Sequence, residues 1–208
     1  MKSPLRYPGG KSRAVKHILP HFPEDVTEVC SPFLGGGSVE LALAEKGVWV
    51  YGYDTFEPLI WFWRALLGNP DALANEADLL RKYKDYYYGH RGLPKDDFNL
   101  IKQELRNEEK YSLQNAAKFY ALNRSSFSGA TLSGGWSKRA SYERFTDSSI
   151  TRVREFSQPK LYVAAQHFKH SIPAHPKTFL YLDPPYLLGK DRENLYGDAG
   201  NKHKGFDH

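Results

Sequence analysis

Thr178-Phe179-Leu180-Tyr181-Leu182-Asp183-Pro184-Pro185-Tyr186 is the stretch that decides how this chain folds. The apolar and aromatic residues 178–182 predict a buried β-strand. Two consecutive prolines carry no backbone N–H for a sheet ladder, so the strand must end at Asp183. This places an acidic residue at the carboxyl end of a strand, which is the edge where ligands bind in open α/β sheets.

The residues after this strand suit a planar molecule that carries an exocyclic amine. Asp183 offers a carboxylate, the Pro184 carbonyl is a second acceptor at a nearly fixed backbone angle, and Tyr186 offers a flat ring. Two acceptors facing an –NH₂ group would aim its lone pair at an electrophile. The alternative is a strand followed by a proline-rich turn, in which Asp183 caps a local backbone group.

A second ligand-binding pattern lies nearer the amino terminus. Residues 26–33 predict a strand, Gly35-Gly36-Gly37 a tight loop, and residues 39–46 a helix closed by a glycine. A further strand at 48–53 ends in Asp54, an acid well placed for ribose hydroxyls. Strand, glycine loop and helix together favour a nucleotide-like ligand held at a helix amino terminus.

Two commoner phosphate-binding motifs do not fit. The dinucleotide fingerprint requires glycine where Glu40 stands, and the P-loop reading of residues 9–12 requires glycine where Leu5 stands.

Length and composition describe one sizeable domain, or one domain with an insertion. The chain has 208 residues, a net charge of +5 and a single cysteine, which fits a reducing compartment. Its start lacks the apolar core of a signal peptide, and no apolar run is long enough to span a bilayer. We therefore expect a cytoplasmic protein without membrane segments.

The positive charge is concentrated in the middle of the chain. Residues 81–154 hold fifteen Lys and Arg against eight Asp and Glu. This excess predicts a polyanion-binding insert, with a merely solvated helical surface as the alternative.

Within this region, residues 71–122 read as mostly helical. Residues 86–88 are three consecutive tyrosines, which either touch DNA or pack the insert. Residues 123–139 read as a polar loop in which serines and cations suit phosphates and an aromatic suits wedging between bases. The candidate DNA-binding residues are Asn123, Arg124, Ser126, Phe127, Ser128, Trp136, Lys138 and Arg139.

Taken together, these motifs resemble those of the Dam-type adenine-N6 DNA methyltransferases (D12 class, alpha group). The Asp183-Pro184-Pro185-Tyr186 stretch resembles the catalytic motif of amino-methyltransferases, and Phe33, Gly35 and Gly37 match their Phe-x-Gly-x-Gly cofactor motif. Residues 123–129 match the Asn-Arg-x-x-Phe-x-Gly hairpin of the target-recognition region. The motifs also follow the order of the class: the cofactor half comes first, then the recognition insert, then the catalytic strand.

The resemblance implies S-adenosylmethionine as cofactor and a site-specific, phage or restriction-modification-like enzyme. The cofactor would be bound by Tyr7, Lys11, Phe33, Gly35, Gly37, Asp54, His167, Phe168 and Asp183. His167 stands where relatives commonly have an aspartate for the cofactor's adenine amine, and either an imidazole nitrogen or the backbone could accept the same hydrogen bond. The alternative is that His167 is a surface histidine that follows a strand. Relatives that read GATC carry an arginine where Thr131 and Leu132 lie here, so GATC is not the expected site.

We thus expect an α/β protein with a doubly wound Rossmann-like sheet and a mainly helical insert. Residues 1–60 and 155–208 would form the catalytic domain, without the family's C-terminal part, and residues 61–154 the target-recognition insert. Asp183, Pro184, Pro185 and Tyr186 would act on an adenine flipped out of duplex DNA, with no metal required. We expect a monomer, with a cognate restriction nuclease as a potential partner.

Two alternatives stay open at this stage. The acceptor could be cytosine N4, RNA or a glutamine amide, or the chain could be a truncated, non-catalytic remnant that only binds DNA or cofactor.

Overall fold

The structure, a computed structural model, describes residues 1–186 and contains a parallel sheet in the order β5-β2-β1-β6. β1 (Glu28–Ser31) pairs with β2 (Trp49–Asp54) on one side and with β6 (Phe179–Leu180) on the other. β5 (Leu161–Ala165) pairs with β2. All three pairings are parallel, so the carboxyl ends of the strands meet at one edge of the sheet.

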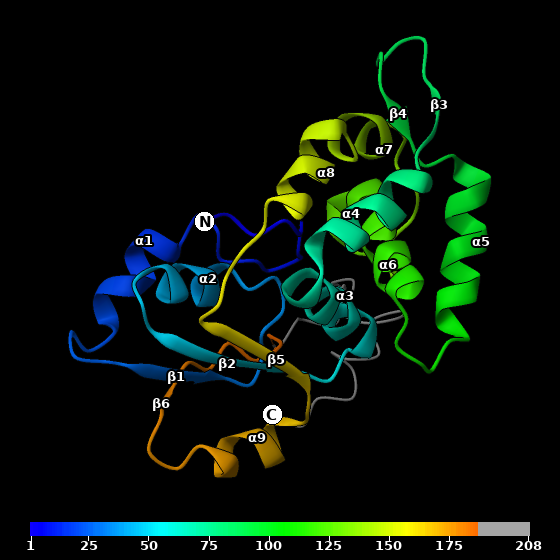
Figure 1. Ribbon diagram of the computed structural model, residues 1–208. Coiled ribbons are helices and arrows are strands. Elements are labelled where there is room, and N and C mark those ends of the chain that lie inside the picture. The colour runs from blue at the N-terminus through cyan, green and yellow to red at the C-terminus, as the bar shows by residue number, and fades with distance from the viewer. Residues whose placement is uncertain (187–208) are drawn as a thin grey trace.

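Helices cover both faces of this sheet, as expected for a doubly wound fold (Figure 1). α2 (Ser38–Glu45) and α3 (Glu57–Gly68) lie over one face, and α9 (Phe168–Ala174) lies over the other. The chain enters through α1 (Val15–Ile18) and the 3-10 turn η1 (Leu19–His21). The α/β class and the parallel central sheet predicted from the sequence are therefore confirmed.

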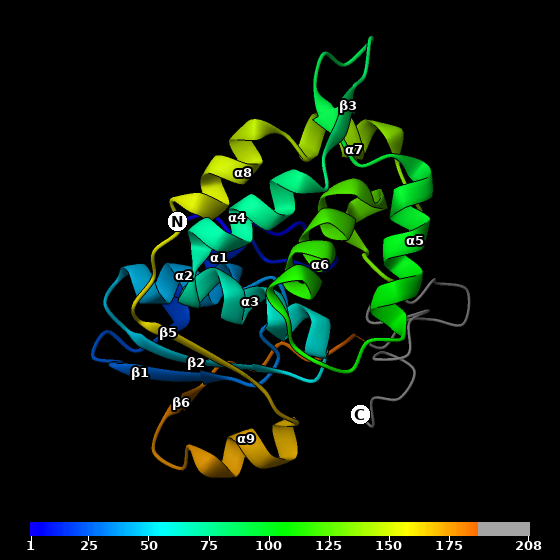
Figure 2. The ribbon, with the colours of Figure 1, turned by 45° about the vertical axis from the view of Figure 1, so that its right-hand side comes forward.

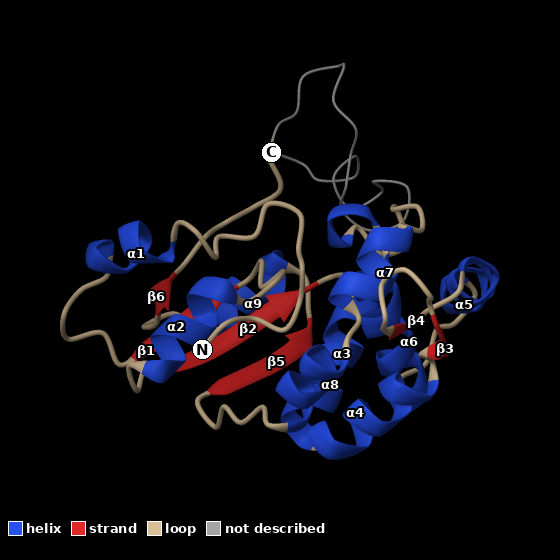
Figure 3. Cartoon of the chain, turned by 90° about the horizontal axis from the view of Figure 1, so that it is seen from above, coloured by secondary structure: helices blue, strands red, loops and turns tan. Residues whose placement is uncertain are grey.

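The remaining elements gather beside the sheet as a mainly helical insert (Figure 3). They are α4 (Pro70–Leu79), β3 (Lys82–Lys84), β4 (Arg91–Gly92), α5 (Lys95–Arg106), α6 (Leu113–Ser125), η2 (Phe127–Gly129), α7 (Lys138–Arg144) and α8 (Asp147–Arg154). Their starts follow from local capping: Asn69, Ser112 and Ser137 each accept a backbone N–H in the first turn of α4, α6 and α7.

One continuous hydrophobic core joins the insert to the sheet. Phe62 and Trp63 of α3 and Phe119 and Tyr120 of α6 are fully buried within it. The domain boundary expected at residue 60 falls inside α3, so that helix belongs to both layers. The division into two domains stays a prediction.

The strand that carries the Asp-Pro-Pro-Tyr stretch differs from the prediction. It is only two residues long, Phe179–Leu180, and the Phe179 side chain is 38% exposed. In the described part of the chain this strand pairs with β1 alone, which explains why a run expected to be buried is partly open.

The predicted polar loop at 123–139 is also shorter than expected. α6 runs through Ser125 and α7 begins at Lys138, so both ends of the predicted loop are helical. An antiparallel bridge between Ser126 and Trp136 closes what lies between. Ser128 and Thr131 have φ of +52° and +47°, so this loop holds non-glycine residues in the left-handed region.

Three further observations bear on the protein's chemistry. No helix among residues 1–186 is long and apolar enough to cross a membrane. Over the same residues no group of His, Cys, Asp or Glu is arranged to hold a metal ion. Cys30 is fully buried in β1, and burial raises the pKa of its thiol to about 11.

Candidate functional site

A cavity of about 370 Å³ opens at the carboxyl edge of the sheet. Its walls come from the amino-terminal segment, the loop between β1 and α2, the end of β2, the start of α9 and the stretch after β6. All nine residues predicted to bind the cofactor line it: Tyr7, Lys11, Phe33, Gly35, Gly37, Asp54, His167, Phe168 and Asp183. Pro184 and Pro185 line it as well, whereas Tyr186 lies outside the wall.

The glycine loop is shaped by close contacts that a side chain would disrupt. Gly35 and Gly37 have φ of +50° and +66°, a conformation that favours glycine. A Cβ on Gly36 would lie 2.7 Å from the Tyr7 side chain, and one on Gly37 would lie 2.7 Å from the Trp63 ring. The loop is therefore held against two aromatic rings with its backbone toward the cavity.

Asp54 and Trp63 tie this loop to its neighbours. Asp54 Oδ2 accepts a hydrogen bond from the Gly35 N–H at 3.1 Å, and its Oδ1 accepts one from the Phe56 N–H at 2.9 Å. Trp63 donates from Nε1 to the Gly35 carbonyl at 3.1 Å. The acid at the end of β2 thus lies directly beside the glycine loop, and its binding of ribose hydroxyls stays a prediction.

Aromatic rings form the wall contributed by the start of α9. The Phe33 and Phe168 centroids are 5.5 Å apart, and the His167 ring lies 4.4 Å from Phe168. His167 Nδ1 accepts a hydrogen bond from the Lys169 N–H at 3.2 Å and so caps α9. A neutral imidazole that accepts at Nδ1 carries its proton on Nε2, which then donates. This arrangement disfavours the predicted role of His167 as an acceptor for an adenine amine.

Asp183 is already engaged on both carboxylate oxygens. Lys11 donates from Nζ to Oδ2 at 2.5 Å, and the Tyr186 hydroxyl donates to Oδ1 at 2.9 Å. Lys11 Nζ also lies 4.8 Å from the Tyr186 ring centroid. Burial alone would lower the pKa of Lys11, but its hydrogen bonds and charge interactions with Asp183 and Tyr186 raise it above the ordinary value.

Two ionisable residues of the cavity wall were not among the predicted site residues. Glu40, in the first turn of α2, is 3% exposed and accepts a hydrogen bond from the Ser31 hydroxyl at 2.6 Å. Burial is the largest influence on this carboxyl and raises its pKa to about 7, with the nearby Asp183 adding to the effect. Tyr181 lines the same wall, and burial raises the pKa of its phenol. The signal that could have identified Glu40 is an acid one turn beyond a glycine loop.

The residues predicted to bind DNA divide into two groups. The first group is buried and bonded to the protein itself. The Asn123 side chain accepts from the Arg6 N–H at 2.9 Å and donates to the Arg6 carbonyl at 2.6 Å. Arg124 donates to the backbone carbonyls of Arg144 and Pro4, and Ser126 Oγ accepts from the Thr131 N–H. The structure gives these three residues a structural role, because their polar groups serve the fold.

The pair formed by Asn123 and Arg6 has a further effect on the cavity. It fixes the backbone next to Tyr7, whose ring packs on the glycine loop. The insert therefore helps to shape the cavity that lies on the sheet.

Four residues of the second group are at the surface. The Phe127 side chain is 64% exposed, Ser128 is exposed, and Lys138 and Arg139 have side chains that are 54% and 74% exposed. Trp136 is packed against the core and donates from its indole to the Leu93 carbonyl at 2.9 Å. A DNA-binding role stays a prediction for all these residues.

Three features define the class of S-adenosylmethionine-dependent amino-methyltransferases. They are a parallel doubly wound sheet, a glycine loop followed by an acid at the next strand end, and an Asp-Pro-Pro-Tyr stretch whose first three residues line the same cavity. Comparison with known proteins places the chain within that class. Residues 7–208 match the family model of the D12 class N6 adenine-specific DNA methyltransferases, and the chain belongs to this family.

A curated relative agrees with this assignment. The chain is 23% identical over 196 residues to the Type II methyltransferase M1.LlaDCHI of Lactococcus lactis subsp. cremoris. The match covers 88% of this chain and 64% of the relative, so the chain spans less than two thirds of that protein's length.

Proposed function

We propose that this protein transfers a methyl group from S-adenosylmethionine to the exocyclic N6 of adenine in a short, specific sequence of duplex DNA. The observation that carries the proposal is that Asp183 and Pro184 lie on the wall of the same cavity as the glycine loop and Asp54. A donor pocket and an acceptor edge that share one cavity suit direct transfer between two bound molecules.

The residues of the cavity fit S-adenosylmethionine. The glycine loop offers backbone that a Cβ would obstruct, Asp54 offers a carboxylate for hydroxyl groups, and Phe33 and Phe168 offer rings for a purine. Tyr7 and Lys11 complete the wall toward Asp183. When bound, the cofactor supplies an electrophilic methyl group on a sulfonium.

On the acceptor side, the chain's task is to hold and orient an amine. The Asp183 carboxylate and the Pro184 carbonyl would accept the two N–H hydrogens, which directs the nitrogen lone pair into the cavity. Tyr186 would stack on the base after its hydroxyl releases Asp183 Oδ1. Because the amine is paired inside a duplex, the base must leave the helix to reach this edge.

The exposed residues of the loop after α6 and of the start of α7 supply the DNA contacts in this proposal. Phe127 would fill space beside the displaced base, and Ser128, Lys138 and Arg139 would contact phosphates. Trp136 would support the loop from behind, and the buried Asn123, Arg124 and Ser126 would hold its backbone.

The test is methyl transfer from labelled S-adenosylmethionine to duplex DNA of mixed sequence, followed by mass spectrometry of the nucleosides. The expected product is N6-methyladenine, with Asp183→Ala abolishing transfer and leaving duplex binding largely intact. Label found in N4-methylcytosine would identify cytosine as the acceptor in place of adenine. Transfer to RNA alone would identify RNA as the substrate. Transfer that survives Asp183→Ala would refute the assigned acceptor edge, and cofactor binding with no transfer to any duplex would favour a non-catalytic role.

A role beside a restriction nuclease is a separate part of the proposal. The relative's designation as a Type II methyltransferase supports it. Protection of methylated DNA against restriction digestion in cells that express the protein would test it.

A further inference from the structure

A two-stranded hairpin, β3 and β4 with the turn between them (residues 82–92), projects from the helical insert (Figures 1 and 2). In both views it stands clear of every neighbouring helix along most of its length. Its tip carries the three tyrosines for which the sequence left two roles open, packing the insert or touching DNA.

The tyrosines of this hairpin differ in how far they are exposed. Tyr86 is fully exposed and Tyr87 is 82% exposed, while Tyr83 on β3 is 79% exposed. The Tyr88 ring stacks on Tyr142 of α7 at 5.9 Å, and the Tyr87 ring meets Tyr88 edge-on with 4.9 Å between their centroids. Tyr86 and Tyr87 leave most of their ring surface in water, and neighbouring exposed aromatic side chains of this kind mark an interaction site.

The tip is held in a defined shape. Asp85 accepts hydrogen bonds from the N–H groups of Tyr87 and Tyr88, and the Asp85 carbonyl accepts from the Gly89 N–H at 2.9 Å. Gly89 has a φ of +67°, the left-handed conformation such a turn requires. The exposed rings are therefore presented by an ordered turn, which lowers the entropic cost of using them in an interface.

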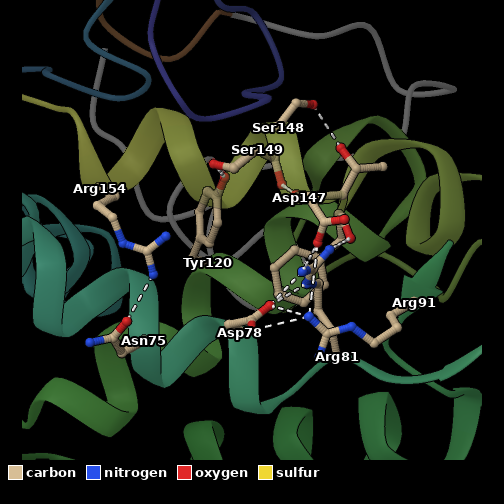
Figure 4. A network of polar contacts seen from close by, with 11 residues as sticks. Asn75, Asp78, Arg81, Arg91, Tyr120, Asp147, Ser148, Ser149 and Arg154 are labelled. Atoms are coloured by element: carbon tan, nitrogen blue, oxygen red, sulfur yellow. Dashed lines mark hydrogen bonds and ion pairs between the residues drawn. The ribbon is translucent and has the colours of Figure 1, made fainter.

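The base of the hairpin is anchored by ion pairs (Figure 4). Arg81, which directly precedes β3 and is 4% exposed, pairs with Asp78 of α4 and Asp147 of α8. Arg91 of β4 donates to the same Asp78 at 3.0 Å. The hairpin is thus a rigid projection of the helical insert.

The side of the hairpin connects it to the loop that the proposed function places on DNA. Lys138 is the first residue of α7 and follows that loop directly. It forms an ion pair with Asp85 at 3.0 Å. Lys138 Nζ also lies 5.8 Å from the Tyr88 ring centroid. The hairpin and the loop therefore share one support, the start of α7.

Charge identifies the kind of partner. Residues 81–92 contain Arg81, Lys82, Lys84 and Arg91 against the single acid Asp85. Lys82 pairs with Asp97, whereas Lys84 is exposed and has no ionic partner among residues 1–186. All three residues of β3 are exposed and two of them are lysines, which disfavours edge-to-edge pairing with another strand. A cationic hairpin with tyrosines at its tip matches a polyanion that offers phosphates to hydroxyl groups and amines.

We propose that the 82–92 hairpin is a second DNA contact, which grips the duplex outside the methylated site through Tyr86, Tyr87 and Lys84. This inference rests on the proposed function, since it extends the same bound duplex along the insert. Phosphate contacts of this kind set register and affinity and carry no sequence information.

The test compares the protein with a triple variant, Lys84→Ala, Tyr86→Ser and Tyr87→Ser, by fluorescence anisotropy on labelled duplexes of mixed sequence. On a duplex of about three helical turns, we expect the variant to bind about tenfold more weakly. The slope of log K against log salt should fall by about one, the value for one lost lysine–phosphate contact.

Matched controls come from the same chain. Leu100→Ser removes an exposed apolar side chain from α5 of the insert, and Lys46→Ala removes an exposed cation from the end of α2. Both should bind the long duplex as the unaltered protein does. Thermal melting of the triple variant should match the unaltered protein, because all three side chains are exposed.

The outcomes separate this inference from the proposed function. Equal binding of the long duplex by protein and triple variant, with methyl transfer present, overturns the hairpin inference alone. Absence of methyl transfer to any duplex by the folded protein overturns the proposed function instead. Sedimentation that shows a dimer of the unaltered protein and a monomer of the triple variant would assign the hairpin to a second copy of the chain, which also overturns the DNA inference.

Discussion

Lys11 and Asp183 lie 172 residues apart in the chain and form an ion pair with 2.5 Å between Nζ and Oδ2. The pair connects the segment before α1 to the stretch after β6, so it closes one side of the cavity. It also means that the carboxylate assigned to the target amine is held by a cation before any base arrives. An incoming amine must share or replace the hydrogen bonds that Lys11 and Tyr186 donate.

Replacing Lys11 should impair both halves of the site. Lys11→Met leaves the partly buried Asp183 without its cation, and we expect kcat/KM for methyl transfer to fall about a hundredfold, the equivalent of about 2.7 kcal/mol. Cofactor affinity, measured by calorimetry, should fall as well. Lys16→Met, on the exposed face of α1, is the control and should change neither quantity. Unchanged transfer in Lys11→Met would show that the pair is dispensable.

The buried Glu40 makes stability depend on pH in a defined direction. Burial raises its folded pKa from 4.5 to about 7, so the folded state holds a proton that the unfolded chain releases between these values. Stability from this group is complete below the unfolded pKa and is lost as pH rises through the folded one, by up to roughly 3 kcal/mol.

Glu40→Gln should therefore melt at a higher temperature than the unaltered protein at about pH 8.5 and at a similar temperature near pH 4.5. Glu24→Gln, at an exposed position, should show no such divergence. Parallel melting curves for Glu40→Gln and the unaltered protein across this range would contradict the buried, protonated state.

The contact between Gly36 and Tyr7 predicts a selective loss of cofactor binding. A Cβ at Gly36 would approach the Tyr7 side chain to 2.7 Å and push it from the cavity wall. We expect Gly36→Ala to weaken S-adenosylmethionine binding at least tenfold by calorimetry, about 1.4 kcal/mol. Gly68→Ala provides the matched glycine control, since a Cβ there meets nothing within 4 Å. Its binding should be unaltered, and equal affinities for the two variants would refute the close-packed loop.

The sequence analysis assigned Arg124 and Arg139 to one DNA-binding surface. Replacing them should have opposite effects on the stability of the protein and on its binding of DNA. Arg124 is 8% exposed and donates to the Arg144 carbonyl at 2.8 Å, whereas the Arg139 side chain is 74% exposed. Arg124→Met should lower the free energy of unfolding by about 2–4 kcal/mol in urea titrations, because two backbone carbonyls lose their donor.

Arg139→Met should leave unfolding unchanged and weaken duplex binding several-fold. The reverse pattern, a stable Arg124→Met that binds DNA poorly, would restore the DNA-contacting role for Arg124.

The cavity was predictable because its chemistry follows from short-range patterns. A glycine loop after one strand, an acid after the next and an acid followed by two prolines after a third must converge once the strands are parallel. Gly35, Asp54 and Asp183 accordingly line one cavity. His167 was placed on the wall correctly, but its tautomer depends on the Lys169 N–H, which only the geometry of α9 reveals.

The recognition region was harder to predict because burial there depends on distant partners. Asn123 and Arg124 look like surface residues in a polar stretch, yet their partners Arg6 and Pro4 lie about 120 positions earlier. No local sequence pattern predicts such contacts. Glu40 was not predicted as a site residue because an acid on a helix is ordinarily solvated. In the structure its carboxyl group instead accepts a hydrogen bond from Ser31 inside the protein.

Cys30 gives the protein a useful chemical property. It is the sole cysteine, its thiol is shielded in β1, and a pKa of about 11 keeps it protonated and unreactive at neutral pH. A thiol introduced at the hairpin tip by Tyr86→Cys would therefore be the one that maleimide dyes modify. The native sequence is in effect ready for single-site labelling, and a fluorophore at that position could report on the hairpin without prior removal of a cysteine.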